Sequence, residues 1–98
     1  MQLSSNKNEK TLTVAVSGRV DTNTAPELEK HITENTDGVS ELILDLKDMT
    51  YTSSAGLRVL LKAHKLMNGK GSMKIVNVQN DVMEILDMTG FSDILNIE

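Results

Sequence analysis

The sequence predicts a small α/β domain, in which strands and helices alternate along the chain. Apolar residues repeat with period two in several short stretches, a pattern typical of strands. Longer segments with helical periodicity separate these stretches, and they begin at capping residues and end at glycines. The chain has 98 residues, which is the size of one ordinary domain. No repeat or linker divides it, so we expect a single domain over residues 1–98.

The first clear strand is predicted over residues 11–18. Its alternating apolar residues, which would face the core, are Leu12, Val14 and Val16. Gly18 marks either the end of this strand or a bulge in it. Residues 1–10 are almost entirely polar, and they would form a weak edge strand or a frayed arm.

A polar loop at residues 21–24 leads into the first predicted helix. Thr24 and Glu27 have the spacing of a capping box, in which each side chain bonds the backbone N–H of the other residue. Pro26 lies in the first turn, where its missing N–H is tolerated. The helix would end before Gly38. Its buried face is predicted to consist of Ala25, Leu28 and Ile32.

A second strand is predicted at residues 41–46. It contains three consecutive apolar residues, which indicate that both faces are covered: Leu42, Ile43 and Leu44. A strand, a helix and a second strand in this order predict a crossover between parallel strands. The polar segments that follow the two strands, residues 21–24 and 50–54, would then be neighbours, because parallel strands end at the same edge of a sheet.

The second helix is predicted from Ser54 to about Met67, with most of its surface covered. Its apolar stripe, with the residues that widen it, comprises Leu57, Val59, Leu60, Leu61, Ala63, His64 and Leu66. A strand near residues 72–78 and a third helix capped by Asn80 would follow. The methionines of that helix, Met83 and Met88, are assigned to the core. Residues 94–97 would add a short last strand, which gives a mixed sheet of four to five strands with helices packed on it.

Composition excludes several classes of function. The formal net charge is −4 and only two residues are aromatic, which is unfavourable for binding nucleic acid. The chain has no cysteine and two histidines, so we expect no thiolate chemistry, no metal and no cofactor. No stretch approaches the roughly 20 apolar residues of a membrane span, and the N-terminus lacks the apolar region of a signal peptide. We therefore expect a cytoplasmic protein that is not bound to a membrane.

Two adjacent serines, Ser53 and Ser54, stand where the second helix should begin. A serine at this position is usually an N-cap, whose side-chain oxygen accepts a hydrogen bond from a free backbone N–H. A cap requires only one serine. The second hydroxyl would lie beside the positive end of the helix dipole, where a phosphate is favoured. The pair is therefore either two ordinary capping serines or a cap followed by a phosphorylation switch.

A hydrolase is an alternative, because a serine at a strand-to-helix turn resembles a nucleophile elbow. That motif needs a glycine two residues before the serine, and Thr52 stands there. His64 lies about 15 Å along the same helix from Ser54, at 1.5 Å per residue. His31, on the first helix, has no obvious carboxylate to orient it. Catalysis is therefore the weaker interpretation.

Charged residues allow two further interpretations. A hard-metal cluster could be built from Asp21, Asp45 and Asp48. Aspartates are much commoner in turns and at strand ends, so we expect no metal site. One face of the second helix carries three cations, and it is either a solvated stripe or a contact surface for an acidic partner: Arg58, Lys62 and Lys65.

Three segments of the chain resemble the STAS domain family, and most closely its stand-alone bacterial anti-sigma-factor antagonists. The matching residues are Ser17 to Asp21 with Pro26 to Leu28, then Leu42 to Leu46 with Tyr51 to Leu57, and finally Thr89 to Phe91. The resemblance implies a small α/β fold with no enzymatic activity. It also implies that the unphosphorylated protein binds an anti-sigma factor, itself a serine kinase, and so releases a sigma factor. Phosphorylation would end the binding, and a serine phosphatase would restore it.

The resemblance also assigns roles to residues. The family's phosphoserine lies two residues before the motif glycine, which is Gly56, and this places the phosphate on Ser54. The family often has aspartate at the position of Ser53. This chain has a serine there instead, so Ser53 is the alternative acceptor. Partner contacts are expected from Asp21, Thr22, Asn23, Thr52, Ser53, Gly56 and Arg58. We expect a monomer in the absence of the partner, and a sensory or scaffold module of the same fold is the alternative function.

Overall fold

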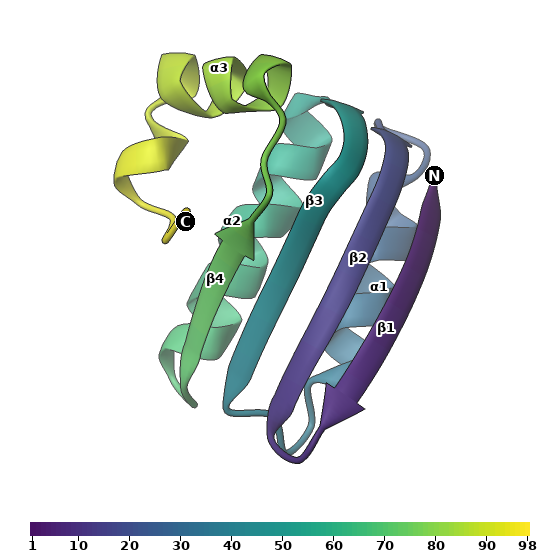
Figure 1. Cartoon of the computed structure of the whole chain (residues 1–98), viewed down its shortest axis with the longest axis vertical. Coiled ribbons are helices and arrows are strands. Elements are labelled where there is room, and N and C mark those ends of the chain that lie inside the picture. Colours follow the sequence, from purple (N-terminus) through teal and green to yellow (C-terminus); the bar gives the residue numbers. More distant parts are fainter.

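The computed structural model describes all 98 residues and shows a four-stranded sheet with two long helices behind it (Figure 1). The elements are β1 (Gln2–Asn8), β2 (Thr11–Val20), α1 (Ala25–Asn35), β3 (Glu41–Thr52), α2 (Ser54–Asn68), β4 (Ser72–Val76), α3 (Asn80–Thr89) and the short 3-10 helix η1 (Phe91–Asp93). The strand order is β1-β2-β3-β4, in which only β1 is antiparallel to its neighbour. The predicted α/β class, the mixed sheet and the parallel crossover are confirmed, and residues 2–8 form the edge strand.

The core lies between the sheet and the two long helices, because apolar residues alternate along the central strands, as predicted for residues 11–18. On β2 and β3 the side chains that face the helices are almost completely buried, and they are Leu12, Val14, Val16, Leu42, Leu44 and Leu46. The helices contribute Leu28, Ile32, Leu57, Leu60 and Met67, among others.

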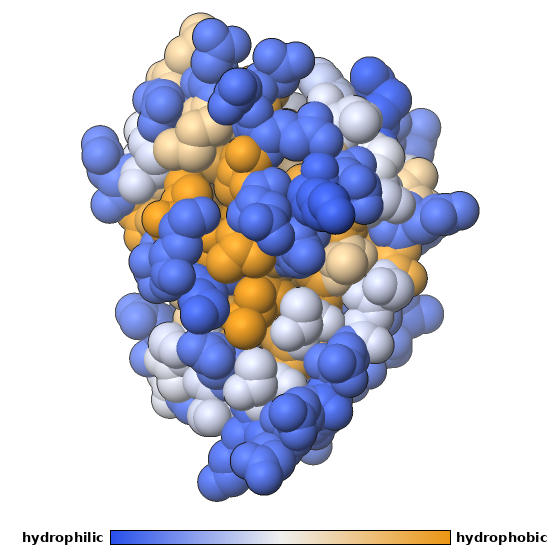
Figure 2. All heavy atoms as spheres, in the orientation of Figure 1, coloured by the Kyte–Doolittle hydropathy of each residue, from blue (hydrophilic) through white to orange (hydrophobic).

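The open face of the sheet corrects one prediction. Ile43, between two completely buried leucines, is only half-buried, so the expectation that both faces of residues 41–46 are covered is wrong. α1 and α2 lie on the same side of the sheet (Figure 1). The other face shows apolar residues interrupted by many hydrophilic ones (Figure 2). Three apolar residues in a row therefore do not require two layers of helices.

Both central strands are longer than predicted, and a bulge in β2 explains part of the difference. Gly18 has a φ of +83° and lies between two register shifts against β3, so it marks a bulge and not the end of the strand. A positive φ of this kind favours glycine. Beyond the bulge, β2 continues to Val20 and β3 to Thr52, and these two residues are register partners. The extension carries both strands to the edge where the site lies.

Two predicted helix caps do not form. Thr24 precedes α1, but its side chain makes no capping hydrogen bond, so the capping box with Glu27 is absent. The Thr24 hydroxyl instead accepts a hydrogen bond from the Asp21 backbone N–H at 2.9 Å. α3 begins at Asn80 itself and follows Gln79, which also makes no side-chain cap. Spacing alone identified these segments as helix starts but not the hydrogen bonds within them.

The C-terminal segment is less regular than predicted. Ile97 makes a single parallel bridge with Ile75 of β4 and forms no strand. Met88 is 86% exposed, so its assignment to the core is wrong, whereas Met83 is half-buried against the core. Leu66 on α2 is also exposed. None of the helices combines the length and the apolar content needed to cross a bilayer.

Candidate functional site

The two polar segments predicted to be neighbours meet at the carboxyl edge of the sheet, at the upper end of β2 and β3 in Figure 1. The Ser53 backbone N–H donates to the Val20 carbonyl at 2.8 Å, which ties the start of α2 to the end of β2. The Asp21 loop leaves the sheet from the next residue. The predicted proximity of the two segments is therefore confirmed.

Ser53 is the N-cap of α2. Its backbone is extended, and its Oγ accepts a hydrogen bond from the Gly56 N–H at 3.4 Å. The Ser53 carbonyl accepts the Leu57 N–H at 3.0 Å, which is the first bond of the helix ladder. The capping role predicted for Ser53 is confirmed, and its hydroxyl is occupied by that role.

Replacement of Ser53 by alanine is expected to lower the free energy of unfolding by about 1 kcal/mol, because the cap is lost. Urea unfolding of the wild type and of Ser53→Ala measures this difference. Ser54→Ala is the matched control and should change stability by less than about 0.5 kcal/mol, since its hydroxyl makes no bond within the protein. A larger loss from Ser54→Ala than from Ser53→Ala would reverse the assignment of the cap.

Ser54 is the first residue of α2, and it is exposed. The first turn of α2 contains no acidic residue, so no side-chain charge there offsets the positive end of the helix dipole. The Ser54 hydroxyl has solvent around it and an environment that favours a negative charge. This arrangement can accept a covalently attached phosphate without disrupting the helix.

Gly56 sets the position of this helix start. A Cβ at Gly56 would overlap the Thr52 hydroxyl and lie 2.9 Å from Cγ1 of Val20, so only glycine lets α2 approach the strand ends this closely. Thr52 and Gly56 are both buried, so they set the position of the α2 start and present little surface to solvent. Their contact with a partner stays a prediction.

Asp21 organises the loop that faces Ser53. Its Oδ1 accepts hydrogen bonds from the backbone N–H groups of Asn23 at 2.9 Å and of Thr24 at 3.0 Å. The bond from the Thr24 N–H lowers the pKa of Asp21 below its ordinary value, and the Asn23 N–H, the Thr24 hydroxyl and the nearby Arg19 act in the same direction. Asp21 is therefore a negative charge held in one place beside the site, while Thr22 and Asn23 are exposed.

The lowered pKa of Asp21 predicts a pH-dependent contribution to stability. The charged form is favoured in the folded state, so the stabilisation is present above about pH 4, the ordinary pKa, and is lost as pH falls through the lower folded pKa.

Asp21→Asn keeps the oxygen acceptor and removes the charge. We expect the wild type to be more stable than this variant at pH 7 and the difference to shrink progressively as the pH falls below about 4. Thermal unfolding across this range measures it, with Asp37→Asn as a control at an exposed loop carboxylate. A difference that does not change with pH would contradict the role of the charge.

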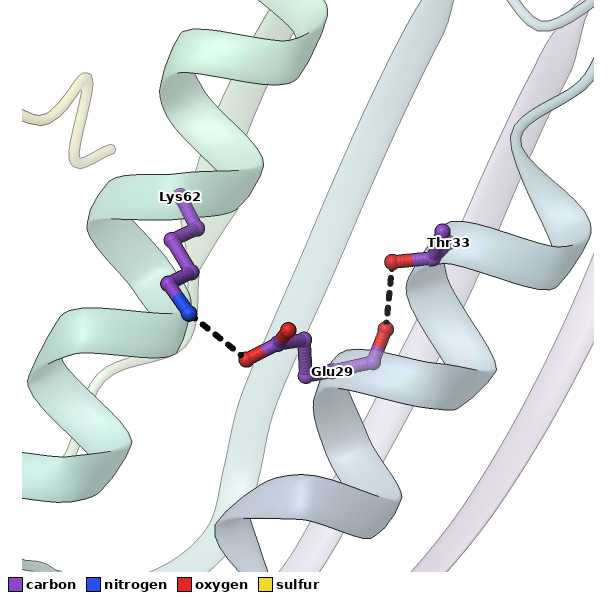
Figure 3. A network of polar contacts seen from close by, with 3 residues as sticks. All are labelled: Glu29, Thr33 and Lys62. Atoms are coloured by element: carbon purple, nitrogen blue, oxygen red, sulfur yellow. Dashed lines mark hydrogen bonds and ion pairs between the residues drawn. The ribbon is translucent and has the colours of Figure 1, made fainter.

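A groove of about 480 Å³ lies between α1 and α2, next to Ser54, and the sequence did not reveal it. Its lining includes Thr22, Pro26, Lys30, Ala55, Arg58 and Lys62. An ion pair crosses from one helix to the other: Lys62 Nζ lies 3.2 Å from Oε1 of Glu29, whose carbonyl accepts the Thr33 hydroxyl (Figure 3). Arg58, one turn before Lys62, makes no ion pair. On the cationic face of α2, Lys62 is therefore paired with Glu29, whereas Arg58, which is nearer to the site, carries an unpaired charge.

A second feature missed from the sequence lies on the strands. The guanidinium of Arg19 stacks over the ring of Tyr51, 4.2 Å from its centroid, and the two residues are register partners on β2 and β3. Both side chains are exposed. They are distant in sequence, and only the register of the two strands, which the bulge at Gly18 alters, places them opposite each other.

The alternative interpretations gain no support from the geometry. Ser54 makes no hydrogen bond to a histidine, and the buried Nε2 of His31 and Nδ1 of His64 have no hydrogen-bond partner. Asp45 accepts hydrogen bonds from the Lys47 N–H at 3.0 Å and from the Asn77 amide at 3.1 Å, so its carboxylate has a structural role. The structure brings no three histidine, aspartate or glutamate side chains together in a metal-binding group.

The chain belongs to the STAS domain family, whose profile matches residues 2–98. It is 30% identical to the anti-sigma-B factor antagonist of Bacillus subtilis (strain 168), over 93% of this chain and 84% of that protein. It is 28% identical to the anti-sigma-B factor antagonist of Staphylococcus aureus (strain NCTC 8325 / PS 47), over 86% of this chain and 80% of that protein. The family predicted from the three sequence segments is therefore confirmed.

Solved structures confirm the fold. A crystal structure of an anti-sigma factor antagonist from Mycobacterium paratuberculosis superposes with a TM-score of 0.87 at 23% identity, covering 98% of this chain and 83% of that one. The phosphorylated form of the Bacillus cell fate determinant SpoIIAA superposes with a TM-score of 0.77 at 12% identity, covering 99% of this chain and 91% of that one. At these identities the likeness concerns the arrangement of helices and strands.

Proposed function

We propose that the protein is an anti-sigma-factor antagonist that phosphorylation of Ser54 switches off. The observation that carries the proposal is the division of labour at the start of α2, where the Ser53 hydroxyl is engaged as a cap and the Ser54 hydroxyl is exposed and free. The relatives named as anti-sigma-B factor antagonists support the class of protein. The similar fold of SpoIIAA in a phosphorylated form supports a switch based on phosphate.

In this proposal the unphosphorylated protein binds an anti-sigma factor that is also a serine kinase, and it thereby releases a sigma factor. A serine phosphatase would return the protein to its binding form. The protein acts as a substrate and a binding partner, not as an enzyme. It is a monomer when free, and it acts in the cytoplasm, where an anti-sigma factor controls transcription.

The partner-binding surface is the carboxyl edge of the sheet with the start of α2. Its members that reach solvent are Asp21, Thr22, Asn23, Ser53, Ser54 and Arg58. Serine and asparagine side chains at this edge present neutral hydrogen-bonding groups, flanked by the negative charge of Asp21 and the positive charge of Arg58. A phosphate of about −1.5 to −2 charges in the middle of this surface would be buried against the partner, and the single charge of Arg58 would offset only part of it.

Phosphorylation should leave the fold unchanged. The phosphate lies at the positive end of the α2 dipole, where a negative charge is favourable, and Ser54 packs against nothing that would have to move. Amide NMR shifts should therefore change around residues 21–24 and 53–58 and remain the same in β1 and β4. Shifts spread across the whole sheet would contradict a local switch.

A kinase reaction tests the proposed class of protein. On incubation with its cognate kinase and ATP, the chain should gain about 80 Da, the mass of one phosphoryl group, on Ser54. Ser53→Ala should still be modified and Ser54→Ala should not. Modification of Ser54→Ala, together with its loss in Ser53→Ala, would move the acceptor to Ser53. A hydrolase would instead react with a serine-directed phosphonate in the absence of kinase, and a scaffold module would do neither.

A further inference from the structure

Arg58 is a free cation one helical turn after the proposed phosphate acceptor. It is exposed on α2, lines the groove between α1 and α2, and makes neither an ion pair nor a hydrogen bond through its side chain. Residues four apart on a helix are neighbours, with Cβ atoms about 5 to 6 Å apart. Ser54 and Arg58 have this spacing, with the group that would become anionic on the N-terminal side. That is the favourable order for an ion pair on a helix.

The other cations near the site are less suitable. Lys62 lies a further turn along α2 and is engaged by Glu29 at 3.2 Å. Arg19 stacks on Tyr51, on the strand side of the site. Lys30 belongs to the second turn of α1, across the groove. Arg58 is the one cation that is on the same helix, at the right spacing and unpaired.

We propose that Arg58 is a positioning residue that holds the phosphate of phosphorylated Ser54 in an ion pair along α2. The inference rests on the proposed phosphorylation of Ser54. It adds which residue the phosphate contacts once it is attached. A guanidinium can form two parallel N–H···O bonds with a phosphate, which fixes the orientation of the group as well as its position. The pair forms no new covalent bond and requires no movement of the backbone.

The pair gives phosphorylation a second effect on the surface. In the unphosphorylated protein Arg58 is available at the groove to a carboxylate of the partner. In the phosphorylated protein the same guanidinium is occupied by the phosphate and directed along the helix. The modification therefore adds an anion at Ser54 and, in the same step, withdraws the cation that the partner would use.

Phosphorus NMR of a protein with phosphoserine genetically encoded at position 54 tests the pair without any kinase or partner. The second pKa of the phosphate reports on nearby cations. Arg58→Gln should raise that pKa by about 0.3 to 0.6 units relative to the protein with Arg58, as expected for a charge-assisted pair on an exposed helix. Arg58→Lys should restore part of the shift, because lysine keeps the charge but not the two parallel bonds.

Lys65→Gln is the matched control, since it removes an exposed cation from the same helix about three turns, roughly 16 Å, from Ser54. It should move the phosphate pKa by less than about 0.1 units, because exposed charges at that distance are screened. In addition, solvent exchange of the Arg58 Nε–H should slow when Ser54 is phosphorylated. Equal phosphate pKa values in Arg58→Gln and Lys65→Gln would overturn the pair. Because the phosphate is installed during synthesis, this result would say nothing against the kinase reaction, and failure of the kinase reaction would leave the pair measurable.

Discussion

Phosphoserine at position 54 is expected to weaken binding to the isolated anti-sigma factor at least about 100-fold, which corresponds to about 2.7 kcal/mol. A neutral hydroxyl in the interface becomes a bulky dianion that loses its water on binding. Asp21, whose carboxylate is fixed by its own loop, adds a like charge nearby. The pair with Arg58 offsets part of the charge but occupies the cation that the partner would contact. Ser54→Ala should bind as tightly as the wild type.

Titration calorimetry with the two forms of the protein measures this loss of affinity. The matched control carries phosphoserine at Ser5, an exposed residue of the edge strand β1. Ser5 pairs with Val14, six residues before the end of β2, so the same charge lies roughly 20 Å from the carboxyl edge of the sheet. The control should bind within about threefold of the wild type, because exposed charges beyond about 10 Å are screened at ordinary ionic strength. Equal weakening by both phosphates would mean that overall charge, and not the position of Ser54, determines binding.

Gly71→Ala is expected to cost about 3 kcal/mol of the free energy of unfolding, because the backbone leaves no room for a side chain there. A Cβ at Gly71 would overlap the carbonyl oxygen of Ser40 and lie 2.6 Å from its carbonyl carbon. The same carbonyl accepts the Ser72 N–H at 2.9 Å, where β3 and β4 begin to pair. Relief of the overlap requires the two strand starts to separate. At roughly 4 to 8 °C per kcal/mol, Tm should fall by about 12 to 24 °C.

Gly69→Ala is the control for this prediction, two residues away in the same turn. A Cβ at Gly69 meets nothing within 4 Å, and its φ of −89° suits any residue. This variant should unfold within about 1 kcal/mol of the wild type. Thermal unfolding of the Gly71→Ala and Gly69→Ala variants measures the difference in Tm. Similar Tm values for the two variants would show that the close approach of Gly71 to Ser40 does not limit stability.

Much of the fold could be predicted because the relevant signals are local. Alternation over residues 11–18 identified the buried face of that part of β2. Three further buried residues lie beyond the predicted strand ends and were missed: Val20, Met49 and Thr52. Gly38 and the apolar spacing of α1 identified that helix, and the strand–helix–strand order fixed the parallel crossover. The signals that failed depend on tertiary contacts. Ile43 has the same character as its buried neighbours, but no element covers its face of the sheet. Met88 has core chemistry, yet it lies on the outer side of α3.

Part of the candidate site could be predicted because its signals are local in sequence. The rest could not, because it depends on tertiary contacts. Two serines at a helix start indicated one cap and one free hydroxyl, and the structure assigns the cap to Ser53. The capping box at Thr24 was misleading because Asp21, three residues earlier, competes for the same hydrogen bonds. The groove beside Arg58 arises from the packing of two helices, which no single stretch of sequence describes.

The most direct test of the account is capture of partners from the native host with four forms of the protein. Wild type and Ser54→Ala should both retain one protein with serine kinase activity, and Ser54→Asp should lose it. Ser53→Asp, which places the same charge on the capping residue, shows whether the effect is specific to Ser54, and a capping aspartate should preserve the helix start. Retention of the same kinase by wild type and Ser54→Asp to an equal extent would contradict the proposal that a negative charge at Ser54 ends partner binding.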